Sequence, residues 1–411
     1  MNTKPHSTTP DWRSPAVIIT ASCLIAITGF GIRASFGLFL DPMTISKGWD
    51  RETFALALAL QNLLWGIGVP VASAISDKFG PTRVMFAGAI MYALGIMGMA
   101  EASSGFMLHM TAGLLTGLGV AFTSFSIALA AIANAVGPER RTMALGLGTA
   151  AGSMGQVLFS PLSQSFISSH GWNSTLWVLA FSTLIIIPLA FCLPGYKTSP
   201  AEKKQQQQSL SAALKEAIAH RGYLLLSLGF FVCGFHVAFI SVHFPAYIKD
   251  LGLDPIVGAY ALSLIGLFNI VGSFIAGVVG QKWSKKYSLS VIYFARAILI
   301  AVLLMVPKTA LTIYLFSATM GLLWLATVPL TSGIVVQIFG VRYMATLFGL
   351  VFFSHQLGSF IGVWLGGYLY DTNGSYDPIW WAGIVLGILA AVIHIPIDEK
   401  PMDRLAGLPA H

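Results

Sequence analysis

Arg33 lies within an apolar stretch, residues 16–40, that is long enough to cross a lipid bilayer. A crossing takes about 20 apolar residues, and an ionised side chain within it costs about 2.5–3.5 kcal/mol on insertion scales. No Asp or Glu lies near the middle of any apolar stretch, so the sequence offers Arg33 no anionic partner. A guanidinium can bind a carboxylate through two parallel hydrogen bonds. We therefore expect Arg33 to bind an organic anion. The alternatives are that it reaches to the membrane surface or bonds backbone carbonyls.

Three further side chains can hydrogen-bond a carboxylate, and two of them can also carry a proton. His236 and Tyr247 lie in one apolar stretch, and His355 lies in a later one. Histidine titrates near neutral pH, so His236 and His355 are candidates for both substrate binding and proton coupling. For His355 the alternative is a hydrogen bond that joins two helices. His243 follows His236 by seven residues, a spacing too long for one shared metal ion, and we predict no metal site.

Neutral polar residues inside the stretches are weaker candidates, because amides and hydroxyls most often join membrane helices, for about 0.6 kcal/mol each. Three of them are predicted to contact the substrate: Gln156, Asn269 and Thr331. Others with the same chemistry are Gln61, Asn62 and Thr327. For Arg296, in the middle of a later stretch, we expect a structural role, with its guanidinium bonded to backbone carbonyls or to a polar group on the preceding span.

The composition is that of an integral membrane protein. Of the 411 residues, 56% are hydrophobic and 9% are charged, and the mean hydropathy is +0.77; soluble domains carry about 25% charged residues. The net charge of +7 therefore does not indicate nucleic-acid binding. The three cysteines form no C-x-x-C pair, and we predict neither a zinc site nor a disulfide framework. We find no signal peptide and no hydrolase, zinc-protease or nucleotide-binding motif, and so we predict no enzyme activity and no cofactor.

Twelve apolar segments of spanning length predict an all-α membrane protein with twelve transmembrane helices in two six-helix repeats. A polar stretch with four consecutive glutamines separates the sixth segment from the seventh, which is typical of a flexible linker. Within it, SLSAALKEAIAH predicts a short surface helix opened by a serine cap. The predicted domains are a six-helix bundle at 1–194, a cytoplasmic linker at 195–221, and a second six-helix bundle with a short tail at 222–411. The segments are 16–40, 52–75, 83–101, 105–134, 142–168, 173–194, 222–247, 256–281, 287–306, 309–338, 343–369 and 378–396.

The distribution of Lys and Arg predicts the orientation in the membrane. If the N-terminus is inside, 17 of the 23 cationic residues fall on the inner side, 4 on the outer side and 2 within spans. Cytoplasmic loops are rich in Lys and Arg, so we expect both termini and the linker to be cytoplasmic. The protein would then be a multi-pass protein of the plasma membrane, which in bacteria is the inner membrane.

The two halves of the chain also resemble each other. The loop after span 2 contains Asp77-Lys78, and the loop after span 8 contains Gln281-Lys282 in the equivalent place. The entry to span 5, RTMALGLG, has its counterpart in RYMATLFG at span 11. Parallel six-span repeats are typical of transporters that bind their substrate near the membrane midplane, between the halves.

These features resemble the major facilitator superfamily over the whole chain. The superfamily's loop after span 2 has its counterpart in Ser73, Asp77, Lys78, Gly80 and Arg83. Within the superfamily, the chain is similar to the monocarboxylate transporter family and its bacterial relatives. The similarity rests on a cationic residue late in span 1 and on a motif that enters span 5, formed by Arg140, Arg141, Ala144 and Gly146.

The resemblance implies roles for several residues. By position, Arg33 takes the place of the family's lysine in span 1. Alternating access would proceed by rocking of the halves, with gating residues at the cytoplasmic surface: Asp77, Arg83, Arg140, Arg141 and Gln281. One difference concerns span 8, where Asn269 and Ser273 stand in place of the family's Asp and Arg.

The predicted function is secondary transport of organic anions, mono- or dicarboxylates, by proton symport or anion exchange. The expected partners are a small organic anion, the lipid bilayer and, for a symporter, protons; we expect no nucleic acid and a monomer. One alternative is an efflux transporter for an anionic siderophore or drug. An alternative of another class is a membrane sensor that does not transport.

Overall fold

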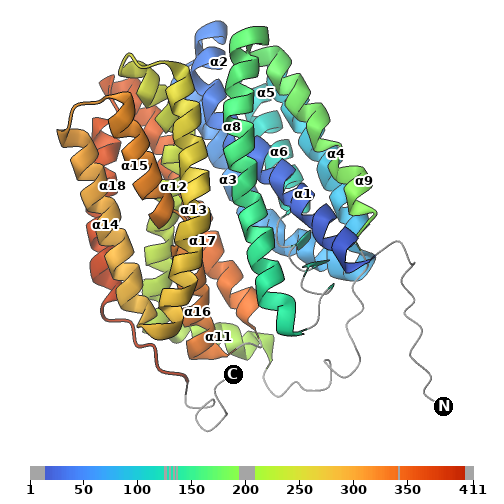
Figure 1. Cartoon of the computed structure of the whole chain (residues 1–411), viewed down its shortest axis with the longest axis vertical. Helices are drawn as coiled ribbons and strands as arrows, with labels where there is room; N and C mark the ends of the chain where they lie inside the picture. The colour runs from blue at the N-terminus through green and yellow to red at the C-terminus, as the bar shows by residue number, and fades with distance from the viewer. Residues whose placement is uncertain are drawn as a thin grey trace.

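The computed structural model describes residues 14–124, 127, 128, 131, 132, 135, 138–193, 209–340 and 343–402. Within its helices, the side chains of residues 77, 138–146, 149, 210 and 345 lie outside the description. The described residues form helices and turns and contain no strand, as the sequence predicts. Figure 1 shows the helices of residues 14–193, here the first half, on one side of the molecule, and those of residues 209–402, the second half, on the other.

The helices follow the predicted segments closely. In the first half they are α1 (Pro15–Ala34), η1 (Phe36–Phe39), α2 (Leu40–Lys47), α3 (Arg51–Phe79), α4 (Pro81–Ala100), α5 (Gly105–Leu108), η2 (His109–Leu115), α6 (Thr116–Phe122), α8 (Pro138–Thr183) and α9 (Ile186–Ala190). In the second half they are α11 (Leu210–Ala219), α12 (Arg221–Asp250), α13 (Pro255–Lys282), α14 (Lys285–Met305), α15 (Ala310–Leu323), α16 (Thr327–Phe339), α17 (Met344–Asn373) and α18 (Asp377–His394).

Eleven helical runs among the described residues are long and apolar enough to cross a membrane. One of them, Ala150–Ala190, has 41 residues and contains Gly171 at φ +82°, a left-handed conformation that ends one helix and begins another. This run is therefore two spans, and the twelve predicted helices are confirmed. The predicted surface helix is also confirmed as α11, where the Ser209 hydroxyl accepts a hydrogen bond from the Ala212 amide. The division into bundles at residues 194 and 222 stays a prediction.

The two halves meet along long helices. Helix α3 packs against α17, and α8 packs against α13. At the end of span 1 the backbone of Gly37 lies so close to α12 that an added Cβ would collide with the Ser241 carbonyl. A glycine at this position therefore permits close contact between the halves.

Span 10, predicted as one segment, is broken in the structure. Helix α15 ends at Leu323 and α16 begins at Thr327. The fully buried Arg296 of α14 donates from Nη2 to the carbonyl of Leu323 at 2.6 Å and also to the carbonyl of Trp324. On the other side of the break, the side-chain oxygen of Asn269 accepts a hydrogen bond from the Leu325 amide at 3.0 Å.

The break is tolerated because these side chains supply the hydrogen bonds that the helix has lost. Backbone groups inside a membrane must be satisfied within the protein, since no water is present to bond them. The cation of Arg296 also lies at the carboxyl end of α15, where the helix dipole favours positive charge. The expected structural role of Arg296, as a donor to carbonyls, is confirmed, although the carbonyls belong to span 10.

Replacing Arg296 with methionine, which has a similar length, should lower the stability of the protein. Each hydrogen bond to a charged group is worth about 1.5–3 kcal/mol, so we expect a loss of about 2 kcal/mol after the desolvation cost of the cation is relieved. Thermal unfolding in detergent measures the change. Arg83→Met, at an exposed arginine, serves as the control. An unchanged melting temperature in Arg296→Met would contradict the role of the arginine at the break.

Candidate functional site

Arg33 lies in the last turn of α1, and its side chain is directed towards α3. Its Nη2 donates a hydrogen bond to the side-chain oxygen of Asn62. Its guanidinium also lies over the ring of Trp65, 4.4 Å from the ring centre. Asn62 and Trp65 are three residues apart and therefore share one face of α3. The Nε of Arg33 is buried and has no hydrogen-bond partner among the described residues.

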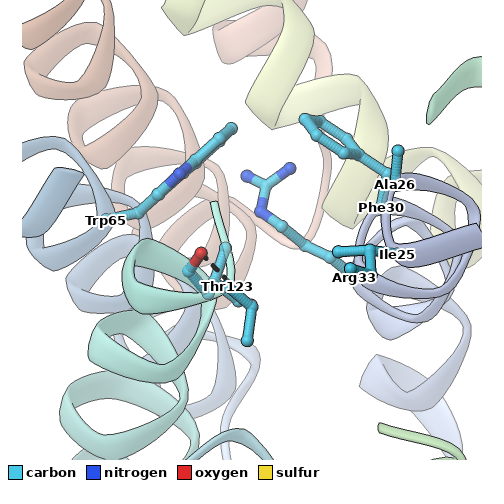
Figure 2. Close-up of a pocket in the computed structure, with 8 residues that line it drawn as sticks. Ile25, Ala26, Phe30, Arg33, Trp65 and Thr123 are labelled. Atoms are coloured by element: carbon cyan, nitrogen blue, oxygen red, sulfur yellow. Dashed lines mark hydrogen bonds between the residues drawn. The ribbon is translucent and has the colours of Figure 1, made fainter. Parts of the chain in front are cut away.

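Arg33 lines a small pocket whose free volume, about 20 Å³, has room for about one water molecule in this conformation. Figure 2 shows the Arg33 guanidinium lying between the rings of Phe30 and Trp65. Among the eight described residues that line the pocket, Arg33 alone is charged. The position of Gly29 leaves open space where another residue would have a side chain. The lining residues are Ile25, Ala26, Gly29, Phe30, Arg33, Trp65, Val120 and Thr123.

Aromatic side chains from both halves pack around Trp65 and form one wall. Phe30 packs edge-on against Trp65 with ring centres 6.0 Å apart, and Phe352 of α17 does so at 5.4 Å. Phe352 in turn stacks on His355 at 5.7 Å. The pocket therefore places one cation among apolar and aromatic side chains. This arrangement suits an anion with an apolar body.

His355 belongs to a polar cluster directly behind this wall. Its Nδ1 lies 3.0 Å from the Gln356 side-chain oxygen, and the Ser359 hydroxyl donates to the same oxygen at 3.3 Å. The Gln356 amide donates to the backbone carbonyl of Asn62 at 3.1 Å. Gln356 therefore joins the second half to the residue that holds Arg33. The sequence analysis missed Gln356, although a buried amide beside a candidate histidine was a usable signal.

Gln156 and Asn269 also join the halves, along α8 and α13. The Gln156 amide donates to the Leu262 carbonyl at 2.8 Å, and the Asn269 amide donates to the Ser153 hydroxyl at 3.0 Å. Neither residue lines the Arg33 pocket. In this conformation both serve as interhelical contacts, and their substrate roles stay predictions.

The remaining predicted ligands lie elsewhere in the second half. His236 is buried against α18, where its Nε2 lies 2.8 Å from the Gly383 carbonyl. Tyr247 packs into an aromatic cluster with its ring centre 5.4 Å from that of Trp380. Thr331 is buried in α16. The structure does not bring these three residues to Arg33, and their roles in substrate binding and, for His236, in proton coupling stay predictions.

The predicted cytoplasmic gate is described in part. The side chains of Asp77, Arg140 and Arg141 lie outside the described residues. Arg83, near the start of α4, and Gln281, near the end of α13, are exposed. Their gating roles stay predictions.

Arg51, which the sequence analysis did not select, forms a cluster at the opposite end of the spans. Its guanidinium donates to both carboxylate oxygens of Asp250 at 2.5 and 2.8 Å, and to Asp41 at 2.8 Å. It also donates to the Tyr376 hydroxyl at 3.1 Å and lies over the Tyr370 ring at 3.8 Å. Burial raises the pKa of the Tyr376 phenol, while the Arg51 cation opposes that rise. We use the name Arg51 cluster for Arg51 and the residues around it: Asp41, Asp250, Tyr370, Tyr376, Asp371 and Glu52.

Asp371 extends the cluster by capping a helix in the other half. It lies in the last turn of α17 and accepts hydrogen bonds from the backbone amides of Arg51 at 3.2 Å and Glu52 at 2.6 Å. These amides open α3, whose own N-cap residue, Asp50, makes no capping bond. A carboxylate at a helix N-terminus is stabilising. Nearby, Trp364 of α17 donates to the Glu52 carboxylate at 2.9 Å.

The Arg51 cluster therefore holds the two halves together at this end of the molecule. Arg51 was counted only as one of four cations on the predicted outer side. A usable signal was the grouping of these few cations with several aspartates at the ends of the spans. The Nζ of Lys249, another of these four cations, lies 3.2 Å from Oδ2 of Asp41.

Comparisons with known proteins agree with this architecture. The sequence profile of the Major Facilitator Superfamily matches residues 21–363. Monocarboxylate transporter 13 from Rattus norvegicus is 24% identical over 84% of this chain and 80% of its own length. Monocarboxylate transporter 11 from Homo sapiens is 26% identical over 87% and 78%. The uncharacterized MFS-type transporter YcxA from Bacillus subtilis (strain 168) is 24% identical over 96% and 97%.

Two solved structures share the fold at low sequence identity. A bacterial homologue of the human lysosomal transporter Spinster, in an inward-facing and occupied conformation, matches with a TM-score of 0.71 and 14% identity, over 92% of this chain and 96% of that one. A D-xylose–proton symporter matches with a TM-score of 0.72 and 14% identity, over 94% and 99%.

Replacing Arg51 with glutamine should separate the halves at this end. The loss of even one hydrogen bond to a charged group, about 1.5–3 kcal/mol, would shift the equilibrium about tenfold or more towards separation. Spin labels at Ile45 and Asn373, exposed residues on the two halves, report the distance between them by pulsed electron paramagnetic resonance. We expect a new population at longer distance. Lys308→Gln, which changes a cation at the same end but outside the cluster, should leave the distribution unchanged. Identical distance distributions in Arg51→Gln and the unsubstituted protein would rule out a role of Arg51 in holding the halves together.

Proposed function

Because the chain belongs to the major facilitator superfamily, we propose that it is a secondary transporter of organic anions with Arg33 as the residue that binds the carboxylate. It is a multi-pass membrane transporter related to the monocarboxylate transporters, and not an enzyme. The observation that carries the proposal is the pocket around Arg33, where one cation faces apolar and aromatic walls. The relatives reported above include monocarboxylate transporters, which supports the same class of substrate.

The single cation of the pocket favours one carboxylate over two. A second carboxylate would have to be buried among apolar walls without a partner, which costs several kcal/mol. The proposed substrate is therefore a monocarboxylate whose body is apolar. The ring of Trp65, which lies against the guanidinium and lines the pocket, offers the apolar body of the substrate a flat surface.

We propose that transport proceeds by rocking of the halves. A carboxylate offsets the desolvation of Arg33 only while it is bound, so occupancy changes the relative free energies of the conformations. Separation of the halves at the end of the Arg51 cluster requires that its hydrogen bonds break. With the cytoplasmic orientation of the termini that the Lys and Arg distribution predicts, this end faces outwards. The proposed location is a plasma membrane, the inner membrane of a bacterium, and the proposed functional unit is a monomer.

Coupling is proposed to be proton symport or anion exchange. For symport, His355 is favoured over His236, because only His355 is linked through Gln356 to the residue that holds Arg33. Uptake that increases at acid outside pH and loses this dependence in His355→Gln would support symport. Uptake independent of pH in the unsubstituted protein would support exchange.

Substitution of Arg33 tests the proposed function. Arg33→Gln should abolish saturable binding of aliphatic and aromatic monocarboxylates, measured on detergent-purified protein by ligand-induced thermal shift. Arg33→Lys keeps the charge but loses the two-donor edge, so affinity should fall by about tenfold, or 1.4 kcal/mol. Arg221→Gln, at an exposed arginine outside the pocket and the predicted gate, should bind like the unsubstituted protein. Near-normal carboxylate affinity in a folded Arg33→Gln protein would refute the role of Arg33.

A further inference from the structure

Arg33 presents two donors along one edge of its guanidinium, and the structure fills only one of them. Nη2 donates to the Asn62 side-chain oxygen, whereas Nε, next to it on the same edge, is buried without a hydrogen-bond partner among the described residues. A carboxylate has two oxygens with the spacing of this edge and binds it at both positions. The amide of Asn62 has a single acceptor oxygen and can fill one.

The Asn62 amide is held in this orientation by a second hydrogen bond. Its Nδ2 donates to the Leu58 carbonyl at 2.8 Å, which directs the side-chain oxygen, and not the nitrogen, towards Arg33. The backbone of Asn62 is fixed in turn by the hydrogen bond from Gln356. The residue is 3% exposed, so water does not compete for Arg33 from this side.

We propose that Asn62 is a neutral placeholder that occupies the carboxylate position at Arg33 in the empty transporter and thereby makes the site selective for anions. This inference rests on the proposed function. A carboxylate displaces the amide because it brings the opposite charge and a second acceptor oxygen, so that it fills both donors of the edge as a bidentate pair. A neutral ligand, such as the primary amide of the same acid, offers Arg33 no better acceptor than Asn62 already provides. Asn62 therefore excludes neutral analogues without contacting the body of the substrate.

The proposal predicts opposite effects for two substitutions at one position. Asn62→Ala removes the competitor, so affinity for monocarboxylates should increase by about tenfold. The ratio of the affinities for a monocarboxylate and its primary amide should become smaller. Asn62→Asp keeps the shape and adds a permanent carboxylate at Arg33, so affinity for monocarboxylates should fall by about a hundredfold or more. A residue that simply bound the substrate, or merely supported the fold, would weaken binding in Asn62→Ala.

A measurement without ligand tests the same contact independently. Asn62→Asp gives the buried Arg33 an anion, so the empty protein should melt at a higher temperature than the unsubstituted one. Arg33→Gln should reverse this gain, because the new carboxylate then lies buried without a cation; the pair forms a double-mutant cycle. Gln61→Glu is the matched control, since it places the same charge one residue away on α3, where the side chain bonds the Ala112 carbonyl instead of Arg33. It should lower the melting temperature.

The experiment therefore combines thermal melting of these variants with a thermal-shift titration against paired monocarboxylates and their primary amides. Higher carboxylate affinity in Asn62→Ala, together with an Arg33-dependent stabilisation in Asn62→Asp, supports the placeholder. Equal or lower carboxylate affinity in Asn62→Ala, while binding still requires Arg33, overturns the placeholder and leaves the proposed function intact. Carboxylate binding that is absent in the unsubstituted protein contradicts the proposed function itself.

Discussion

The organisation of this protein depends on the cost of a cation inside a layer that contains little water. A guanidinium within the hydrocarbon must find acceptors in the protein or in a ligand, and the middle of the spans contains no carboxylate. At Arg33 the protein supplies one neutral oxygen, from Asn62, and the face of one aromatic ring, from Trp65. A further donor, Nε, is buried with no acceptor among the residues that the structure describes. This incomplete solvation makes the site attractive to an anion.

Arg296 faces the same constraint and meets it in part, in a different way: Nη2 is bonded, while Nε and Nη1 are buried without a partner among the described residues. Its acceptors are two backbone carbonyls that are available because span 10 is broken after Leu323. The arginine and the break thus stabilise each other: the helix end supplies oxygens, and the cation supplies donors. Asn269 bonds an amide on the far side of the break and the Ser153 hydroxyl of the first half, which places the break in contact with the interface between the halves. The two arginines differ in their surroundings: Arg33 lines a pocket, whereas Arg296 is fully buried against the end of α15.

The sequence predicted the twelve spans and the two repeats, because composition over long windows encodes both. It also identified Arg33 as a cation within a span, because a charge there is unfavourable. It could not predict the break at residues 324–326, since a local loss of helix depends on an acceptor from α13 and a donor from α14 that are distant along the chain. The contact between Gln356 and Asn62 could not be predicted either, because the two residues are distant along the chain. His236 was selected for its chemistry, but α18 lies against its ring, and only packing reveals this. Arg51 resembled an ordinary loop cation until the fold brought it to Asp41 and Asp250.

The central claim is that the charge of the substrate, and not its body, is what Arg33 recognises. Uptake into proteoliposomes tests it most directly, with radiolabelled monocarboxylates compared with the primary amide and the primary amine of the same carbon skeleton. The account predicts saturable uptake of one or more acids, and no saturable uptake of the matched amides or amines. Saturable uptake of an amine or amide at a rate equal to that of its acid would contradict it, because a site built around a cation with no anionic partner in the protein does not favour such a ligand.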